Sequence, residues 1–525
     1  MPKIRTADEV AALIRDGATV AAAAFGLAGW PEEIARAIER RFLATGHPRD
    51  LTLVHGSATG DWKEKGITRL GHEGLIKRWI GAHIGSSANM CRLVEEDKIE
   101  AYNLPQGVIV HLWREIAARR PGVITKVGLG TFVDPRTGGA KLNSRTTEDI
   151  VQVIELEGEE YLFFKTFPVD VALIRGTVAD ENGNLTMDKE GILVEALPLA
   201  QATRNSGGTV IAQVEYVAKA GTLHPKDVKV PGILVDYIVV CTDTEYHYQT
   251  EGTYYNPAFA GEIKVPLEAL QPLPLDERKI IARRAAMELI PGAIVNLGVG
   301  IPSDVAAVAA EEKAVDLMTL TTEAGSIGGV PASLPHFGHA YNAEATIEHH
   351  AQFDFYDGGG IDVAFLGQAQ VDAEGNVNVS KFGRRVIGCG GFINISQTSK
   401  KVVFCGTFTA GGLKVRVEDG KLAIEQEGRS KKFINKVDQI TFSGRYAQKI
   451  KQPVLYVTER AVFNLDDGGV TLIEIAPGVD LEKDILAQMD FKPRIASNLK
   501  SMPREIFLPR WGQLRGIIEA RKRGR

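Results

Sequence analysis

A stretch of this chain occurs twice at a constant separation, and this repeat limits the possible folds more than any other sequence feature. The segment 169–185 matches the segment 361–377, at a separation of 192 positions. Both segments carry an apolar run followed by a turn of the form Asp-x-x-Gly-Asn. The same separation still holds at Val210 and Val402. A match without gaps over roughly forty residues indicates a duplicated domain.

Strand-like and helix-like runs alternate along the chain. The apolar run Ala18–Phe25 predicts a buried strand, and Pro31–Leu43 predicts a helix with an apolar face. Proline suits the first helical turn, and the two glutamates after it suit the positive end of the helix dipole. The same order returns later, where Gly292–Val295 echoes Gly17–Val20. The sequence therefore predicts two similar, open α/β domains with mostly parallel sheets.

The two copies differ in length. Copy one runs 139 residues from Pro31 to Asp170, whereas copy two runs 60 residues from Pro302 to Asp362. Copy one therefore carries about 80 additional residues, which we place at about 60–149. Three prolines between the copies indicate a linker. The expected organisation is an N-terminal domain at 1–264, a linker at 265–276 and a C-terminal domain at 277–525.

Charge and composition exclude several classes of protein. The chain has 61 basic and 66 acidic residues and a net charge of −5, so a nucleic-acid partner is not expected. Its four cysteines form no CxxC pair, which argues against a disulfide framework and a zinc site. The longest apolar candidate, Val20–Leu27, is too short to cross a membrane. We expect a cytoplasmic enzyme without a membrane partner.

Residues that follow predicted strands are the first candidates for chemistry, because open α/β sheets bind ligands at the carboxyl ends of their strands. In copy two, the strand-like run Ala314–Thr322 leads into Glu323 and then into small residues that leave space over its carboxylate. A rough alignment places Ser57 of copy one opposite Glu323. A carboxylate in only one copy is a candidate for catalysis. The alternative is a solvated glutamate at the end of a strand.

Two glycine-rich turns could present backbone amides to an anion or a carbonyl oxygen. The first, Asn296–Pro302, follows a strand and opens a helix. Ser303 stands where the dinucleotide-binding fingerprint needs its third glycine, so that function is not predicted. The second turn, Gly388–Phe392, follows two apolar residues. Each turn can also be an ordinary connection, and the chain has no P-loop for ATP.

Two further hypotheses have weaker support. Cys389 could act as a thiol nucleophile, but no histidine stands in a partner motif. Four histidines lie within fifteen residues of one another, but their spacing matches no metal-binding motif, so no metal is expected. These are His336, His339, His349 and His350.

Several motifs along the chain resemble those of family I coenzyme A transferases. They are Asn103–Gly107, Gly128–Pro135, Asn296–Pro302, Thr322–Gly325, Gly388–Ser396 and Glu474–Leu481. The first two are similar to those of single-chain enzymes that act on short acyl groups, such as acetate and propionate CoA-transferases. The resemblance spans nearly the whole chain. It implies two fused α/β domains of the NagB/RpiA/CoA transferase type, with the active site between them.

The resemblance also implies roles for particular residues. Glu323 would be the nucleophile, and the oxyanion would be stabilised by the side chain of Gln106 and the backbone amide of Gly390. The implied coenzyme A contacts are Asn296, Gly298, Val299, Gly300, Ile301, Gly388 and Gly391. Such enzymes move CoA from an acyl-CoA to a free carboxylate by a ping-pong mechanism, through a glutamyl-CoA thioester. They need no metal or permanently bound cofactor, because coenzyme A is a substrate.

Two other classes of function stay open at this stage. An acyl-CoA hydrolase could use the same scaffold and the same intermediate, with water as the acceptor. A non-catalytic protein that binds CoA or senses a sugar phosphate could share the fold, although Glu323 argues against it. The expected partners are acyl-CoA and small carboxylates, among which acetate, propionate, butyrate, lactate and acetoacetate are not distinguished. The resemblance also implies a homo-oligomer, either a tetramer or a dimer.

Overall fold

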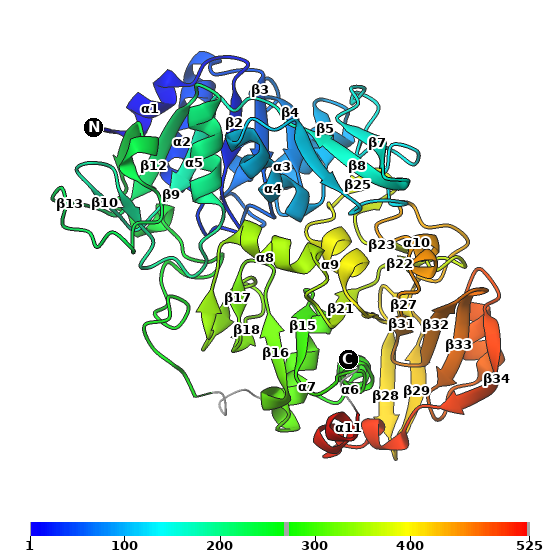
Figure 1. Ribbon diagram of the computed structural model, residues 1–525. Coiled ribbons are helices and arrows are strands. Elements are labelled where there is room, and N and C mark those ends of the chain that lie inside the picture. Colours follow the sequence, from blue (N-terminus) through cyan, green and yellow to red (C-terminus); the bar gives the residue numbers. More distant parts are fainter. Residues whose placement is uncertain (1, 267–271, 522–525) are drawn as a thin grey trace.

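Two open α/β sheets, one from each copy, make up most of the computed structural model, which describes residues 2–266 and 272–521 (Figure 1). The first sheet has eight strands, and every neighbouring pair is parallel. Their spatial order is β1 (Lys3–Arg5), β14 (Tyr237–Val240), β12 (Thr209–Val214), β9 (Val171–Arg175), β2 (Thr19–Ala22), β3 (Leu51–His55), β4 (Ile76–Gly81) and β5 (Glu100–Asn103). The central strands are apolar and buried, as is typical of a sheet covered on both faces.

The second sheet has ten strands, and its centre is parallel from β16 to β31. Their spatial order is β20 (Ala345–Thr346), β17 (Ser326–Ile327), β16 (Met318–Thr321), β15 (Ala293–Leu297), β21 (Val363–Gly367), β26 (Val402–Cys405), β31 (Val454–Val457), β32 (Ala461–Asp466), β33 (Gly469–Ile475) and β34 (Arg494–Ser501). Among its described strands, antiparallel pairs occur only towards the two edges. The two sheets confirm the predicted α/β fold with mostly parallel strands.

Helices cover both sheets, and short strands form smaller sheets beside them. The α-helices of the described residues are α1 (Ala7–Leu13), α2 (Glu32–Thr45), α3 (Ala88–Glu95), α4 (Gln106–Ala117), α5 (Ala196–Asn205), α6 (Glu277–Ala286), α7 (Asp304–Glu311), α8 (His349–Asp357), α9 (Phe392–Thr398), α10 (Gly444–Lys449) and α11 (Leu514–Ala520). None of these helices has the length and apolar character needed to cross a membrane.

Three strands beside copy one form a small antiparallel sheet, in the order β6 (Gly122–Thr125), β8 (Glu159–Lys165) and β7 (Val151–Leu156). A second three-stranded sheet contains β11 (Leu185–Thr186), β10 (Val178–Asp180) and β13 (Tyr216–Ala218). The remaining strands pair two by two: β18 (Val330–Pro331) with β19 (Ala340–Tyr341), β22 (Gln370–Val371) with β23 (Val377–Asn378), β24 (Lys381–Phe382) with β25 (Arg385–Val386), β27 (Thr409–Ala410) with β30 (Ser430–Lys431), and β28 (Lys414–Glu418) with β29 (Lys421–Gln426).

The repeat in the sequence is also a repeat in the structure. Strand β9 lies between β2 and β12 in the first sheet, and β21 lies between β15 and β26 in the second. The carboxylate of Asp170 accepts from the N–H of Thr19 at 2.8 Å, and the carboxylate of Asp362 accepts from the N–H of Ile294 at 2.9 Å. Equivalent aspartates therefore make the same bond to equivalent strands, which confirms the duplication.

The register of the strands refines the alignment of the two copies. Leu53 of β3 corresponds to Leu320 of β16, because each pairs with the equivalent residue of the neighbouring strand. The residue three positions after Leu320 is Glu323, so its counterpart in copy one is Gly56 and not Ser57. The rough alignment was wrong by one residue, because sequence similarity around these strands is too weak to fix their register.

Two predicted strands are shorter in the structure than in the sequence pattern. The run Ala18–Phe25 forms a strand only over Thr19–Ala22, and the chain then turns back, with the N–H of Phe25 donating to the carbonyl of Ala28. The run Ala314–Thr322 begins with a short 3-10 turn, and β16 starts at Met318. Apolar runs continue into buried turns here, so composition does not mark where the strands end.

The segment 60–149, predicted as an insertion, contains β4, β5 and β6 and the helices α3 and α4. Strands β4 and β5 extend the first sheet beyond the part that the two copies share. Of the predicted linker at 265–276, residues 267–271 lie outside the described residues. The boundaries of the domains stay predictions.

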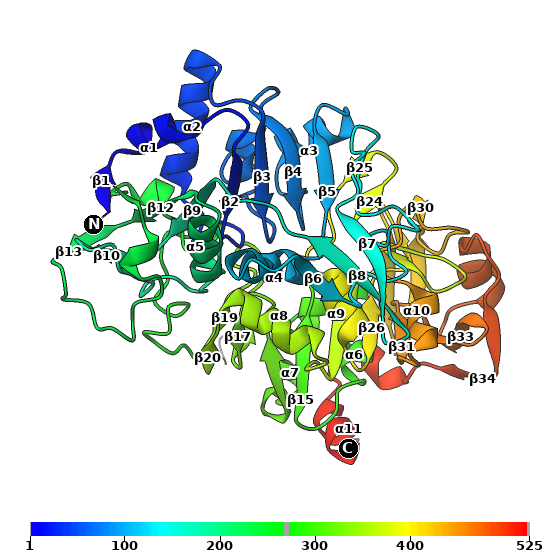
Figure 2. The same ribbon diagram turned by 45° about the horizontal axis from the view of Figure 1, so that its top comes forward.

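Helices α4, α8 and α9 lie between the two sheets (Figure 2). Ala324, Cys389 and Ile393 of copy two belong to the same buried apolar cluster as the first sheet. Val110 of α4 belongs in turn to a cluster of copy two. The two copies thus share continuous apolar packing. This packing fixes the positions of the side chains that each copy contributes to the interface between them.

Candidate active site

A cavity of about 350 Å³ lies between the two copies. Copy one contributes Phe25, Gly26, Ala58, Trp62, His83, Gln106 and Glu251 to its wall. Copy two contributes the turns after β15 and β16, the end of β21 and the glycine segment before α9. Ligands of open α/β sheets bind at this end of the strands. The cavity therefore lies where the active site was predicted, between the two domains.

Glu323 stands in the turn between β16 and β17, with its side chain at the cavity. Gly325 allows this turn, with φ at 114° and no room for a side chain against the backbone of Ile347. In the described part of the chain, no donor hydrogen-bonds to the Glu323 carboxylate. Burial raises the pKa of Glu323 from 4.5 to about 7, and the charge that His349 carries when it is protonated opposes this increase. Near neutral pH the carboxyl group is therefore divided between its protonated and ionised forms, and its oxygen atoms have no hydrogen-bond donor among the described residues.

The glycine segment before α9 is held against copy one like a short added strand. The N–H of Ile84 donates to the carbonyl of Ile387 at 2.9 Å, and the N–H of Gly390 donates to the carbonyl of Ala82 at 2.8 Å. A side chain on Gly388 would collide with the same backbone, since its Cβ would lie 2.6 Å from the Ala82 oxygen. Glycine is needed here because two backbones approach so closely.

Gly391, the last residue of this segment, lies directly against the nucleophile candidate. A Cβ on Gly391 would overlap Oε2 of Glu323. The N–H of Gly391 has no acceptor in the described part of the chain, whereas the N–H of Gly390, the predicted oxyanion donor, already binds Ala82. The free amide beside Glu323 therefore belongs to Gly391.

Gln106 begins α4 and is tied to copy two through a buried histidine. Its Nε2 lies 2.9 Å from Nε2 of His349, and Nδ1 of His349 lies 2.8 Å from Oε2 of Glu195. All three side chains are buried. Because the Glu195 carboxylate only accepts, His349 carries a proton on Nδ1, and its Nε2 accepts from the Gln106 amide. This relay, Glu195–His349–Gln106, fixes the plane of the amide.

The backbone beside Glu195 is strained. Val194 has φ at 43°, which a β-branched residue rarely adopts, and its carbonyl accepts from the N–H of His349 at 3.2 Å. Such strain persists where the surrounding structure holds it in place, and it concentrates at functional sites. Residues 194 and 195 thus bind His349 through both backbone and side chain.

The predicted coenzyme A contacts fall into two groups. Asn296, Gly298 and Val299 line the cavity, together with Gly388 and Gly391. Gly300 and Ile301 follow on the same turn but are not part of the cavity wall. The backbone N–H groups of residues 299–301 have no acceptor among the described residues, so they are available to a ligand.

The side chain of Asn296 lies beneath the cavity surface. It is buried, and its Nδ2 donates to the Tyr356 hydroxyl at 3.2 Å. That hydroxyl donates to Oγ1 of Thr321 at 2.7 Å. Asn296 thereby supports the floor of the cavity beneath Glu323, while its Oδ1 has no partner among the described residues.

The alternative nucleophile and the metal hypothesis gain no support. Cys389 is buried, its Sγ contacts the carbonyl of Leu104 at 3.5 Å, and burial raises the pKa of its thiol. The histidines of the cluster do not share one site, since His349 contacts Gln106 whereas His336 contacts Thr250. Within residues 2–266 and 272–521, no group of three or more metal-ligand side chains could hold an ion.

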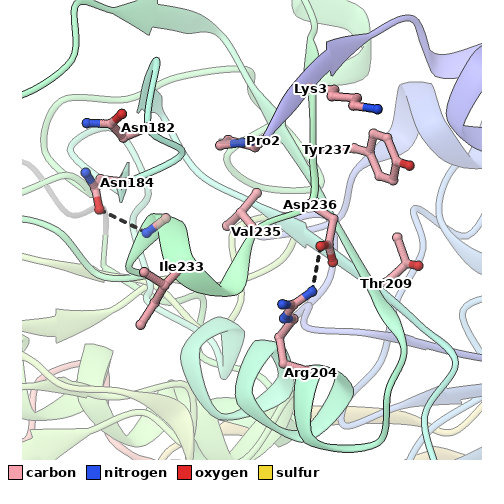
Figure 3. Close-up of a pocket in the computed structure, with 11 residues that line it drawn as sticks. Pro2, Lys3, Asn182, Asn184, Arg204, Thr209, Ile233, Val235, Asp236 and Tyr237 are labelled. Atoms are coloured by element: carbon pink, nitrogen blue, oxygen red, sulfur yellow. Dashed lines mark hydrogen bonds and ion pairs between the residues drawn. The ribbon is translucent and has the colours of Figure 1, made fainter.

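A second, larger depression of about 690 Å³ lies on the outer side of copy one (Figure 3). It is lined mainly by β1, β14 and the loop before β14, and Ile233 on its rim is 84% exposed. Two of its charged residues, Arg204 and Asp236, form an ion pair at 2.6 Å. None of the predicted site residues lines it, whereas Glu323 and Gln106 line the smaller cavity, which is therefore the candidate active site.

Sequence reasoning missed three residues of the cavity region, Glu195, His349 and Glu251. His349 drew attention only as one of four histidines in a possible metal cluster. Glu195 and Glu251 stand in no motif. Their places at or near the cavity depend on contacts between residues far apart in the chain. A single sequence does not show which distant residues make contact.

Comparison with known proteins defines the class of this enzyme: the chain belongs to the coenzyme A transferase family. A family model described as coenzyme A transferase matches residues 4–241. The chain is 59% identical to caffeate CoA-transferase of Acetobacterium woodii, over 99% of this chain and 100% of the relative. It is 45% identical to acetate CoA-transferase YdiF of Escherichia coli (strain K12), over 90% of this chain and 88% of that protein.

A crystal structure of YdiF from E. coli O157:H7, a thioester complex with CoA, matches the fold with a TM-score of 0.91 and 44% sequence identity. The match covers 97% of this chain and 96% of that one. These findings establish an enzyme that transfers CoA between an acyl-CoA and a carboxylate. Coenzyme A is its substrate and not a permanently bound cofactor.

Proposed function

We propose that this enzyme transfers CoA in two half-reactions through a thioester on Glu323. The carboxylate attacks the acyl carbonyl carbon of the donor, a C–O bond forms, and the C–S bond breaks to release the CoA thiolate. The thiolate then attacks the carboxyl carbon of Glu323 in the resulting anhydride. A C–S bond forms, the anhydride C–O bond breaks, and the first carboxylate leaves. An acceptor carboxylate runs the same steps in reverse.

One observation carries this proposal: the Glu323 carboxyl group borders the shared cavity without a hydrogen-bond partner in the described residues and with its pKa raised to about 7. A carboxylate paired with an arginine or held by backbone amides would be a poorer nucleophile. Burial without such partners keeps the group reactive, and apolar surroundings strengthen every polar contact in the transition state.

Each step passes through a tetrahedral oxyanion, which needs donors already in place. We assign these donors to the Nε2 amide of Gln106 and the N–H of Gly391. The relay Glu195–His349–Gln106 uses one of the two hydrogens on Nε2 and leaves the other for the oxyanion. The choice of Gly391 over Gly390 is supported by the bond that Gly390 already makes to Ala82.

The relatives are named for caffeate and acetate, and both are monocarboxylic acids. We propose that this enzyme also acts on monocarboxylates, from acetate and propionate to larger acids of the caffeate type. Hydrolysis of acyl-CoA is not favoured, because these relatives are named as transferases. The cytoplasmic location and the homo-oligomeric state stay predictions.

Steady-state kinetics test the proposed function. The first carboxylate leaves before the acceptor binds, so the mechanism is ping-pong. When acyl-CoA is varied at several fixed acetate concentrations, double-reciprocal plots are expected to be parallel. Intersecting lines would require a ternary complex and would rule out a covalent enzyme–CoA intermediate on the main path.

A further inference from the structure

A second carboxyl group, that of Glu251, lines the cavity from copy one. The transfer steps at Glu323 do not use it. It is only partly exposed, and burial raises its pKa from 4.5 to about 7, with a further increase from the charge of Asp61. Hydrogen bonding from the Trp62 side chain acts in the opposite direction. Burying a carboxyl group without a cation to pair with it costs free energy. A functional role would explain why Glu251 lies in the cavity wall.

A tight turn holds Glu251 in this place. Oγ1 of Thr250 accepts from the N–H groups of Gly252 and Thr253, each at 3.1 Å, and also contacts Nδ1 of His336 at 2.8 Å. On the other side, a Cβ on Gly26 would lie 3.1 Å from Oε1 of Glu251. The carboxyl group therefore packs against bare backbone, between a rigid turn of its own and the turn after β2.

Aromatic rings line the same cavity as this carboxyl group. The rings of Trp62 and His83 meet edge to face at 6.0 Å, and the rings of Phe25 and Phe337 stack at 6.0 Å. All four line the same cavity. Trp62 has φ at 63°, an unusual conformation for a bulky residue. The backbone is thus held in an unfavourable state that places an indole at the cavity wall.

His83 adds a neutral polar group to the same wall. Burial lowers its pKa to about 4, so the ring carries no charge at neutral pH, and its Nδ1 has no hydrogen-bond partner among the described residues. Glu251 is therefore the one carboxyl group that copy one contributes to the described cavity wall. No Lys or Arg side chain belongs to the cavity wall that the structure describes, so nothing there would pair with an anionic ligand group.

The arrangement of the cavity assigns this wall to the acyl group. Copy two supplies the glycine-rich turns with free amides, and Glu323 and Gln106 mark where the reacting carbonyl lies. The remaining wall, formed by copy one together with Pro331, Leu334, Phe337 and Gly338 of copy two, is the part that faces the rest of the acyl chain.

We propose that Glu251 is the specificity-determining residue of the acyl pocket: it admits acyl groups whose far end is uncharged, favours those that carry a hydroxyl there, and excludes dicarboxylic acids. This inference rests on the proposed function. A hydroxyl can donate to a Glu251 oxygen, and a hydrogen bond to a charged group is stronger than one between neutral groups. A second carboxylate would instead meet a like charge in a poorly hydrated pocket, without a cation to compensate it.

Two matched pairs of acceptor acids test the inference at pH 8. Butyrate and succinate have the same chain length and differ by the second carboxylate, whereas 4-hydroxycinnamate and cinnamate differ by one hydroxyl. In Glu251→Gln, the butyrate-to-succinate ratio of kcat/KM is expected to fall at least about tenfold, through a gain in succinate use. The hydroxycinnamate-to-cinnamate ratio is expected to fall at least about fivefold.

A gain of activity with succinate cannot come from misfolding, so it separates specificity from stability. Glu245→Gln is the control, because Glu245 is exposed, pairs with Lys65 and does not line the cavity. Both ratios should be unchanged there. Ratios in Glu251→Gln within twofold of the unmodified enzyme would overturn the inference. Failure of the proposed function would show separately, as intersecting kinetics of the unmodified enzyme with any acceptor.

Discussion

Glu323→Gln is expected to abolish CoA transfer and, at the same time, to make the folded enzyme more stable above pH 7. The amide cannot attack the thioester, so kcat should fall by roughly 10⁴-fold or more. The change in stability follows from the raised pKa. Protonated Glu323 fits its surroundings, and the stability that this form contributes is lost as the pH rises from 4.5 through about 7.

The neutral amide avoids that loss, so the stabilisation should be nearly absent near pH 4.5 and reach about 3 kcal/mol at pH 8.5. Thermal unfolding at both pH values measures it. Glu459→Gln is the control, because Glu459 is fully buried but accepts from Arg460 at 2.7 Å and from the N–H of Phe408 at 2.9 Å. That variant should lose stability and keep its turnover per folded molecule. A Glu323→Gln protein with substantial turnover would contradict the assignment.

Gln106→Ala is expected to lower kcat and kcat/KM together by roughly 10²–10³-fold, with little change in the binding of acyl-CoA. The lost hydrogen bond strengthens only when charge develops on the carbonyl oxygen. Turnover is measured per active site, counted by the amount of enzyme that forms a covalent adduct. Full turnover per active site would remove Gln106 from the mechanism and leave the oxyanion to the Gly391 amide.

Gln213→Ala is the matched control for this change. Gln213 is equally buried in copy one and donates to the carbonyl of Tyr246 at 2.8 Å, but it does not line the cavity. It should lose stability and keep kcat. Equal losses of kcat in both variants would show that removing any buried glutamine of copy one disturbs the enzyme, and that Gln106 has no special role.

Much of the fold could be predicted from the sequence, because the duplication and the alternation of strands and helices are visible as local sequence patterns. The repeat at 169–185 and 361–377 corresponds to equivalent strands and to the same aspartate contact in both copies. Strand register could not be predicted to the residue, so Ser57 was aligned with Glu323 where the structure places Gly56. Register depends on pairing between distant segments, and a slip of one residue changes every side-chain direction.

The candidate site was predictable where a residue stands in a motif at the end of a strand, as Glu323 and the glycine turns do. The sequence could not predict which glycine has a free backbone N–H. The N–H of Gly390 donates to the carbonyl of Ala82, which belongs to the other copy. The same holds for Glu195, which reaches Gln106 through His349. These contacts join segments more than a hundred residues apart, and only the folded chain defines them.

The central claim is that Glu323 carries CoA as a thioester, and mass spectrometry tests it most directly. The enzyme is incubated with acyl-CoA in the absence of any acceptor, and its intact mass and its peptides are then measured. We expect a gain equal to CoA less one water, located on the peptide that contains Glu323 and missing in Glu323→Gln. An adduct on another residue such as Cys389, or turnover without any adduct, would contradict the account.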